Sequence, residues 1–325
     1  MKFTRWLIGL LLMAAVLPGW AQGWTPQKNV EIVVGSAPGG SNDKTARTVE
    51  HILTANKLIG TSLTVINKPG GGGNIMLNYI SQHAGDGHYL MVGTPSLLTN
   101  HITGSSKMHY SDFTPIASLF NDYVVFAVNA DSPIKTGKDL IERLKKDPKS
   151  ITIGFATTLG SHNHIAAGLL MKAIGGNAKE LKVVAFKGSA EAVTTLLGGH
   201  IDLVTTAAGN AATHVASGRM RLVGVAAPKR FPGALAAVPT WQEQGVNLVF
   251  GGWRGIMGPK GLTPAQAGYW EGVLRKATEA PEWKTDLEKN FWSDDFAAGE
   301  PFRKDLAQDY AAMKSVLIEI GLAKQ

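Results

Sequence analysis

The stretch VVGSAPGGSND, residues 33–43, joins a short apolar strand to a polar helix start through a Pro-Gly-Gly loop. A simple turn would not need so many exposed backbone amides. Gly39 and Gly40 let the backbone approach a ligand closely, and Ser41 adds a hydroxyl group. The unpaired N–H groups of the following helix carry partial positive charge. We therefore expect this loop to bind an anion.

Asp43 has two possible uses at the end of this loop. Its carboxylate can cap the start of the helix, or it can bind an ammonium or hydroxyl group of a ligand. The cap preferences of aspartate leave both interpretations open.

Short apolar segments alternate with amphipathic ones along most of the chain, which predicts an α/β fold with parallel sheets covered on both faces. One further strand within residues 247–259 and two long helices are expected to complete the chain. The other expected strands are residues 30–34, 62–67, 89–93, 123–128, 151–155, 181–186, 201–206 and 221–226. Helices are expected to start at Ser41, Asn74, Thr136, Ser161 and Ser189.

The length of 325 residues favours two compact lobes over one. We expect lobe 1 to comprise residues 22–122 and 229–325, and lobe 2 to comprise residues 123–228. The chain would then cross between the lobes twice.

The first 21 residues have the pattern of a secretory signal peptide. Lys2 and Arg5 precede an apolar run over residues 6–17, and cleavage is expected after Ala21. The run of about 12 apolar residues is shorter than the roughly 20 that span a bilayer. We therefore expect export to the periplasm, and the absence of cysteine argues against a lipid anchor on that residue.

The charge of the chain argues against a nucleic-acid partner. The formal net charge is +7, and it falls to +5 if Lys2 and Arg5 are removed with the signal peptide. This excess mildly favours anionic partners. The basic residues form no block, however, and no zinc-finger spacing or aromatic platform motif accompanies them.

Further loops follow the carboxyl ends of other expected strands, where ligands bind in open parallel sheets. Asn74 follows four consecutive glycines, and Thr94 ends the third strand. In the second lobe, the segment GFATTLGSHNH leads into a helix, and Lys187 to Ser189 occupy the equivalent place one unit later. Each loop could also be a plain turn. Together they predict a clamshell that closes on a small polar anion.

Motifs of enzymes and metal sites are missing from the sequence. It contains no G-x-G-x-x-G, no G-x-x-x-x-G-K-[ST] and no G-x-S-x-G. His162 and His164 lie two residues apart at a helix start, which points their rings apart and does not suit a metal. We expect His164 to lie near the cleft and His162 to face solvent. No catalytic residue, cofactor or metal is predicted.

An ordered set of motifs resembles one known family, the periplasmic substrate-binding receptors of tripartite tricarboxylate transporters, also called the TctC or Bug family. The resemblance implies a type II periplasmic binding protein, in which two α/β lobes on a two-segment hinge close over a small carboxylate. It also implies membrane transporter components as partners. The motifs include APGGSND, NKPGGGGN, GDGHYLMVGT, GSHNHIAAG, VVAFKGSAEAVTTLLGGHIDL and WRGIMGPKGLTPAQ. The implied ligand-binding residues are Pro38, Gly39, Gly40, Ser41, Asp43, Asn74 and Thr94 of lobe 1 and Thr158, Gly160, Ser161 and His164 of lobe 2.

The sequence departs from the family pattern in lobe 2. The loop before His164 is one residue longer than the common pattern, and Thr206 stands where a polar or acidic contact is frequent. Arg254 could reach a distal carboxylate of the ligand, or it could form a surface ion pair.

These features favour a monomeric receptor for a di- or tricarboxylate, with delivery of that solute to the transporter. Two alternatives stay open at this point. The chain could bind an amino acid or aromatic acid as the partner of a sensor, or it could be a secreted hydrolase or isomerase on a similar frame.

Overall fold

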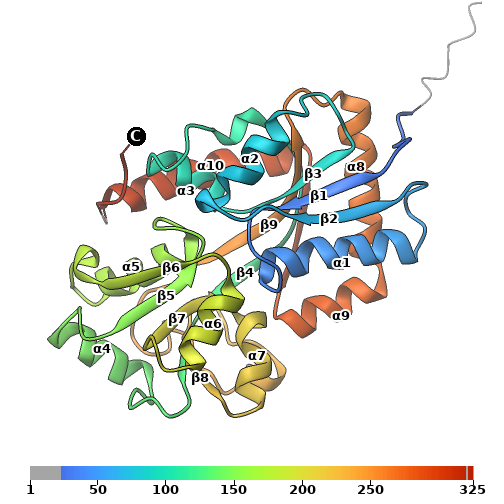
Figure 1. The fold of residues 1–325 in the computed structure, drawn as a ribbon. Helices are drawn as coiled ribbons and strands as arrows, with labels where there is room; N and C mark the ends of the chain where they lie inside the picture. The colour runs from blue at the N-terminus through green and yellow to red at the C-terminus, as the bar shows by residue number, and fades with distance from the viewer. Residues whose placement is uncertain (1–22, 320, 325) are drawn as a thin grey trace, which may run out of the picture.

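The computed structural model describes residues 23–319 and 321–324. The expected signal peptide, residues 1–21, lies outside the described residues. The chain forms two α/β parts, joined by the long strands β4 and β9 (Figure 1). We call them half A (residues 23–123 and the described residues from 251 onward) and half B (residues 124–250). Half A therefore holds both the first strand and the last helix.

Half A is built on a mixed sheet with the order β2-β1-β3-β9-β4, and β10 also pairs with β4. Strands β1, β2 and β3 are parallel, and β9 is antiparallel to both β3 and β4. The strands are β1 (Val30–Val34), β2 (Leu63–Asn67), β3 (Tyr89–Gly93), β4 (Phe113–Asn129), β9 (Gly251–Pro259) and β10 (Ser293–Ala298). The helices are α1 (Ser41–Ala55), α2 (Asn74–Ser81), α3 (Ser96–Ile102), α8 (Pro264–Glu279), α9 (Pro281–Asn290) and α10 (Glu300–Glu319).

Half B is built on a sheet with the order β4-β7-β5-β6, and β8 also pairs with β4. Strands β5, β6 and β7 are parallel, whereas β4 is antiparallel to β7 and β8. The strands are β5 (Thr152–Ala156), β6 (Lys182–Phe186), β7 (Leu203–Ala207) and β8 (Met220–Val225). The helices are α4 (Gly137–Lys146), α5 (His162–Ala173), α6 (Ser189–Leu197) and α7 (Ala208–Ala216). Short 3-10 turns are η1 (Gly71–Gly73), η2 (Tyr110–Asp112), η3 (Ala178–Glu180) and η4 (Gly233–Leu235).

Strand β4 belongs to both sheets and forms one crossing between the halves. Its last pair with β9 is Tyr123 with Gly251, and its first pair with β7 is Val124 with Ala207. The second crossing is the step from Phe250 into β9, which starts at Gly251. Two adjacent segments therefore connect the halves.

The packing of residues 231–248 places them with half B. Trp241 and Leu248 are buried in one core of half B, and Phe231 and Leu235 are buried in its other core. The division expected from the sequence assigned this segment to lobe 1. The two-lobe division remains our proposal, and this packing moves its second boundary from residue 228 to about residue 250.

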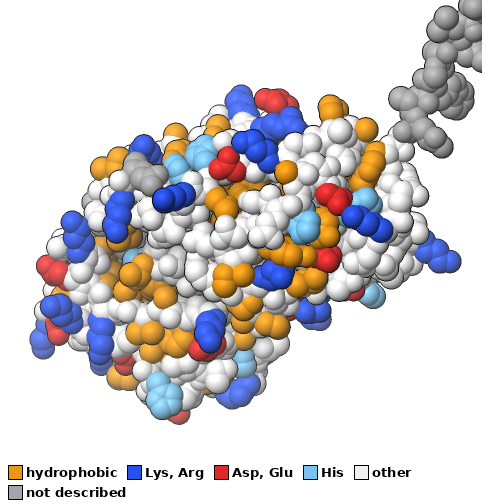
Figure 2. Space-filling model, turned by 45° about the horizontal axis from the view of Figure 1, so that its top comes forward, with side chains coloured by type: hydrophobic (Ala, Val, Ile, Leu, Met, Phe, Trp, Pro, Cys, Tyr) orange, Lys and Arg blue, Asp and Glu red, His pale blue; other side chains and the backbone are white. Residues whose placement is uncertain are grey.

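The sequence predicted all the strands of half B to within two residues at each end, apart from the length of β4. It missed the first part of β4 and all of β10, and it predicted two C-terminal helices where the structure has α8, α9 and α10. Among the described residues, no helix is both long and apolar enough to cross a membrane. On the face drawn in Figure 2, lysine and arginine side chains are scattered and do not form one patch.

Candidate functional site

Two adjoining cavities lie where the halves meet. The interlobe cavity has a volume of about 20 Å³, and the side cavity has a volume of about 30 Å³. Both are lined by Asn42, Thr94, Ser96 and Thr157. The interlobe cavity is also lined by Ser36, Gly40, Ser41, Ala156, His162, Asn163, Ser189, Ala207, Asn210 and Arg254. Its walls therefore come from both halves.

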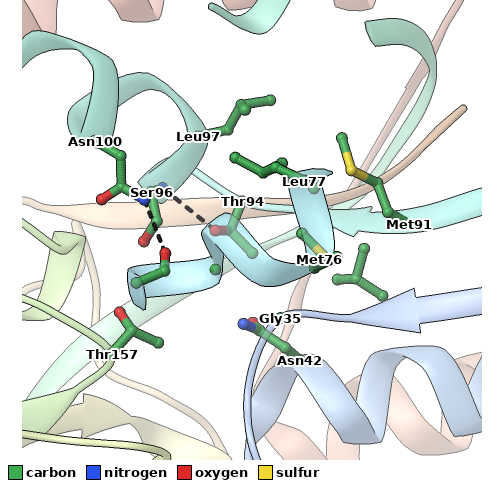
Figure 3. A pocket seen from close by; sticks show the side chains of 14 residues that line it. Gly35, Asn42, Met76, Leu77, Met91, Thr94, Ser96, Leu97, Asn100 and Thr157 are labelled. Carbon is green, nitrogen blue, oxygen red and sulfur yellow. Dashed lines mark hydrogen bonds between the residues drawn. The ribbon is translucent and has the colours of Figure 1, made fainter. Parts of the chain in front are cut away.

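The side cavity extends from the interlobe cavity into half A. Figure 3 shows the polar side chains Thr94, Ser96 and Asn100 at one end of it and the thioethers of Met76 and Met91 at the other. Each cavity has room for little more than one or two water molecules, because a water needs about 10–15 Å³ by this measure. A larger solute can enter only if the halves move apart.

Three helix N-termini without a side-chain cap meet at the interlobe cavity. They belong to α1 of half A and to α6 and α7 of half B, whose N-cap residues are Gly40, Gly188 and Ala207. The backbone N–H groups in the first turn of a helix have no partner within the helix. They are therefore available to an anion, which the helix dipole also favours.

Two helices that start away from the cavity are capped by side chains, whereas α9, whose N-cap residue is Ala280, is not. Thr136 of α4 and Thr263 of α8 each form a complete capping box with the third helical residue. Helix α5 is intermediate, because the Ser161 side chain accepts a hydrogen bond from the His164 amide. Without a side-chain cap, the first-turn amides of α1, α6 and α7 are available to another partner at the cavity.

Buried polar atoms without a hydrogen-bond partner gather around the cavities. Such atoms normally find a partner in the protein or in ordered water. Within the described residues, five cavity-lining side chains carry one. They are Ser36, Asn100, His162, Asn163 and Arg254.

A buried ion pair lies at the floor of the interlobe cavity. Arg254 of β9 is 2% exposed, and its Nη2 lies 3.5 Å from Oδ2 of Asp122, which is in β4. The same Oδ2 accepts a hydrogen bond of 2.6 Å from Ser41 Oγ. Arg254 Nη1 donates to the carbonyls of Gly252 and Trp253. The guanidinium is thus fixed on the two strands that connect the halves.

Burial shifts the pKa of both members of this ion pair. It raises the pKa of Asp122 despite the nearby Arg254, and it lowers the pKa of Arg254 despite the nearby Asp122. Each group therefore depends on the other to stay ionised in a site that solvates charge poorly. The pair is a neutral unit overall, and Arg254 is not the surface ion pair that the sequence allowed.

The half A residues predicted from the sequence divide into two groups. Gly40, Ser41 and Thr94 line the interlobe cavity. Pro38 and Gly39 are exposed on the loop before α1 and do not line either cavity. Asn74 also lies outside the lining, and its side chain donates to the Ser105 carbonyl at 2.8 Å.

Asp43 holds the loop in shape. Its Oδ2 accepts from the Gly39 amide at 2.9 Å and from Arg47 Nε at 3.0 Å, and its Oδ1 accepts from Asn67 at 2.9 Å. Burial raises the pKa of Asp43, but the hydrogen bonds from Arg47, Gly39 and Asn67 outweigh burial and lower it overall. Both carboxylate oxygens are thus occupied within half A, which favours a structural role over a ligand contact, although Asp43 holds the loop and does not cap α1.

The half B residues predicted from the sequence lie beside the cavities. Thr158, Gly160, Ser161 and His164 are absent from the lining of both. Thr158 approaches Gly72 across the halves, and Gly160 approaches Thr103 in the same way. The neighbouring Thr157 lines both cavities, and its φ of 76° is strained for a residue with a Cβ.

The roles expected for the two histidines of α5 are exchanged. His162 is 7% exposed and lines the interlobe cavity, so its predicted solvent-facing position is wrong. His164 stacks on Phe155 with ring centroids 4.7 Å apart, and its Nδ1 accepts from the Gly160 amide. Burial lowers the pKa of His164 to about 4, so it is a neutral structural residue.

Several lining residues escaped the sequence analysis, namely Ser36, Asn42, Asn163 and Asn210. Ser189 had been noted as a loop hydroxyl. These residues share one feature that the sequence could have revealed. Each lies within three residues of a strand end or a helix start on the same edge of its sheet. Within the described residues, no cluster of three or more metal-binding side chains is present.

Comparison with known proteins identifies the family of the chain. The model of the tripartite tricarboxylate transporter family receptors, TctC, matches residues 46–322. The chain belongs to this family. Among curated relatives, the UPF0065 protein in the gbd 5' region of Cupriavidus necator is 28% identical over 315 residues, covering 95% of this chain and 93% of that protein.

Solved structures agree with the TctC assignment. The periplasmic binding protein BugD is 25% identical, with a TM-score of 0.84 over 92% of this chain and 100% of BugD. An R. palustris protein solved with adipate is 24% identical and also has a TM-score of 0.84, over 92% of this chain and 99% of that protein. The family resemblance and the binding-protein fold expected from the sequence are both confirmed.

Proposed function

We propose that this TctC-family chain is a periplasmic receptor that captures a small organic carboxylate, favouring di- and tricarboxylates, and delivers it to a tripartite tricarboxylate transporter. The receptor acts as a monomer, and no bond of the solute is made or broken. The proposed export signal is the basic and apolar pattern of residues 1–21.

One observation supports this proposal above the others. Uncapped helix N-termini from both halves meet at the interlobe cavity, where Ser36, His162 and Arg254 also carry buried atoms that can donate and have no partner among the described residues. Amide and hydroxyl donors of this kind bind carboxylates without reacting with them. The R. palustris protein of the same fold carries a dicarboxylate, adipate, which is consistent with this class of solute.

The two-segment connection gives the receptor a way to close. A carboxylate can contact α1 of half A and α6 or α7 of half B together only when the halves are close. These extra contacts in the closed form shift the equilibrium toward it. The neutral Asp122–Arg254 unit on the connecting strands leaves the helix N-termini as the main source of positive potential.

A ligand screen tests this function. The purified mature protein is tested by thermal shift against acetate, succinate, adipate, citrate, glutamate and benzoate, and hits are measured by calorimetry. A solute that binds only the folded form at 100 times its Kd adds about 2.7 kcal/mol to the stability. We expect shifts with succinate, adipate or citrate, and none with acetate.

Other outcomes of the same screen contradict the proposal. Shifts with glutamate or benzoate alone would indicate an amino-acid or aromatic-acid receptor. Chemical conversion of a bound solute would indicate an enzyme. If no member of the panel shifts the melting temperature, the carboxylate class itself is wrong.

A further inference from the structure

We propose that His162 binds the solute carboxylate directly through Nδ1–H, that Arg254 is the positioning residue that fixes this tautomer, and that their contact makes solute affinity fall in mildly acidic solution. This inference rests on the proposed function, because it assigns a contact and a regulation to the same cavity.

The position of His162 is the first support. It is the first residue of α5 in half B, it lines the interlobe cavity, and it is 7% exposed. Its Nε2 lies 3.3 Å from Nη2 of Arg254, which belongs to β9. The side chain therefore reaches from half B to a strand that connects the halves.

The chemistry of arginine fixes the tautomer of this histidine. A guanidinium has donors only, so Nε2 must be the acceptor in this contact. A neutral imidazole that accepts at Nε2 carries its proton at Nδ1. This Nδ1 is buried and has no hydrogen-bond partner among the described residues. It is therefore a free donor on a wall of the cavity in which we place the carboxylate.

Arg254 is held too firmly to turn away from His162. Its Nη1 donates to two carbonyls of β9, and its Nη2 faces Asp122, which Ser41 also holds. The guanidinium is thus largely occupied and buried. It is better suited to orient His162 than to form a new bidentate pair with a solute carboxylate.

The same contact links solute binding to pH. The charged group in contact with His162 is Arg254 of β9, which is itself paired with Asp122 of β4. In the closed form, burial and then Arg254 lower the pKa of His162 well below its ordinary 6.5. Asp122 does not offset this, because its Oδ2 already faces Arg254 and Ser41.

The direction of the pH effect follows from this lowered pKa. When the halves separate, His162 leaves Arg254 and its pKa returns toward about 6.5. A solute carboxylate at Nδ1 favours the charged ring, but a charged ring also carries a hydrogen on Nε2, which would face the donor-only guanidinium of Arg254. Because of this contact, protonation below that pH stabilises the open form, and closing on a solute must release the proton. Affinity is therefore complete above about pH 6.5 and falls as the pH decreases below it, approaching tenfold per unit.

Two substitutions separate the two roles of the ring. His162→Asn keeps a donor near the position of Nδ1 but removes the titrating group. His162→Gln reaches the position of Nε2 and loses the Nδ1 donor. The matched control is His51→Gln, because His51 is exposed on α1. Affinities for adipate and for citrate are measured by calorimetry at pH 7.5 and 5.5.

The wild type and the His51→Gln variant are expected to bind these probes about tenfold more weakly at pH 5.5. His162→Gln should lose about tenfold or more at pH 7.5, because a hydrogen bond to a charged group is lost. His162→Asn should retain most of the affinity, and both His162 variants should lose the part of the pH dependence that comes from the histidine, which leaves only the protonation of the solute itself. Wild-type affinity with wild-type pH dependence in His162→Gln would overturn the proposal.

A spectroscopic measurement decides the histidine state independently of affinity. Long-range ¹H–¹⁵N spectra of the wild type at pH 7.5, with and without 10 mM adipate or citrate, report the tautomer of His162, which is assigned by comparison with His162→Asn. An Nδ1–H tautomer supports the proposal, and an Nε2–H tautomer under all conditions overturns it. If neither probe binds, the proposed function fails for these solutes, while the tautomer still tests His162.

Discussion

Gly40 is a residue at which we expect a substitution to affect binding more than stability. It is the N-cap of α1, with φ of −88° and ψ of 176°, which is extended backbone that other residues adopt. A Cβ at this position would lie 3.6 Å from Ser189 on the opposite half. The absence of a side chain therefore leaves space between the halves and places no special demand on the backbone.

Replacing Gly40 with valine tests this role. The backbone accepts valine, so we expect the free energy of unfolding to change by less than about 1 kcal/mol. The two added methyl groups should crowd Ser189 in the closed form and weaken adipate or citrate binding about tenfold or more. Chemical denaturation and calorimetry measure the two effects.

The control for this substitution is Gly60→Val, because a Cβ on Gly60 would meet no atom within 4 Å. It should bind like the wild type. Wild-type affinity in Gly40→Val would remove this loop from the site, and a loss of folding would show that Gly40 is structural.

At the same residue scale, the sequence located the loop that leads into α5 but did not predict the orientation of its side chains. The spacing of His162 and His164 correctly pointed their rings apart, yet it did not show which ring faced the cleft. The ring that faces the cleft is decided by the rotation of α5 about its own axis relative to β5, and this rotation stacks His164 on Phe155. Arg254 was likewise recognised as a candidate, but its partner Asp122 lies 132 positions away in the chain and only the fold brings them together.

At the scale of elements, the cap of α4 differs from the starts of the three helices that we propose to bind the solute. Helix α4 has a complete capping box at Thr136, whereas α1, α6 and α7 have no side-chain cap. The five helix starts named from the sequence agree with the structure to within one residue. Ser41, Asn74 and Ser189, however, are first helical residues and do not cap their helices, whose N-cap residues are glycines.

Removing the cap of α4 should therefore affect stability alone. Thr136→Ala loses the hydrogen bond to the Asp139 amide and should destabilise the fold by about 1 kcal/mol in urea denaturation. Adipate or citrate affinity should not change. Thr136→Ser keeps the oxygen and is the matched control. A loss of affinity in the alanine variant would contradict the division between structural and binding helices.

Strands without a local apolar pattern were missed. Strand β10 is SDDFAA, and the first part of β4 contains Pro115 and the polar pair Asn121–Asp122. These residues are typical of loops, and tertiary pairing places them in a sheet. Asp122 interrupts the apolar sequence of β4, and its carboxylate pairs with Arg254. This ion pair accounts for the polar residue within the strand.

At the scale of the whole molecule, the chain leaves half A once and returns once, which gives it two adjacent connecting segments. The length of the chain favoured two lobes. It could not predict that residues 231–248 pack on half B, because that segment has little regular structure and its assignment depends on the burial of Trp241 against Phe126. The halves lie so close together that only about 20 Å³ remains in the interlobe cavity, and the sequence did not predict this closeness either.

The central claim is that backbone amides and small polar groups of both halves hold one carboxylate solute between them. A crystal structure of the mature protein with adipate or citrate, whichever binds more tightly, tests this claim most directly. We predict a carboxylate group at the N-terminus of α1 that also contacts α6, α7 or His162 of half B. A solute bound outside this cavity, or touching one half alone, would contradict the account.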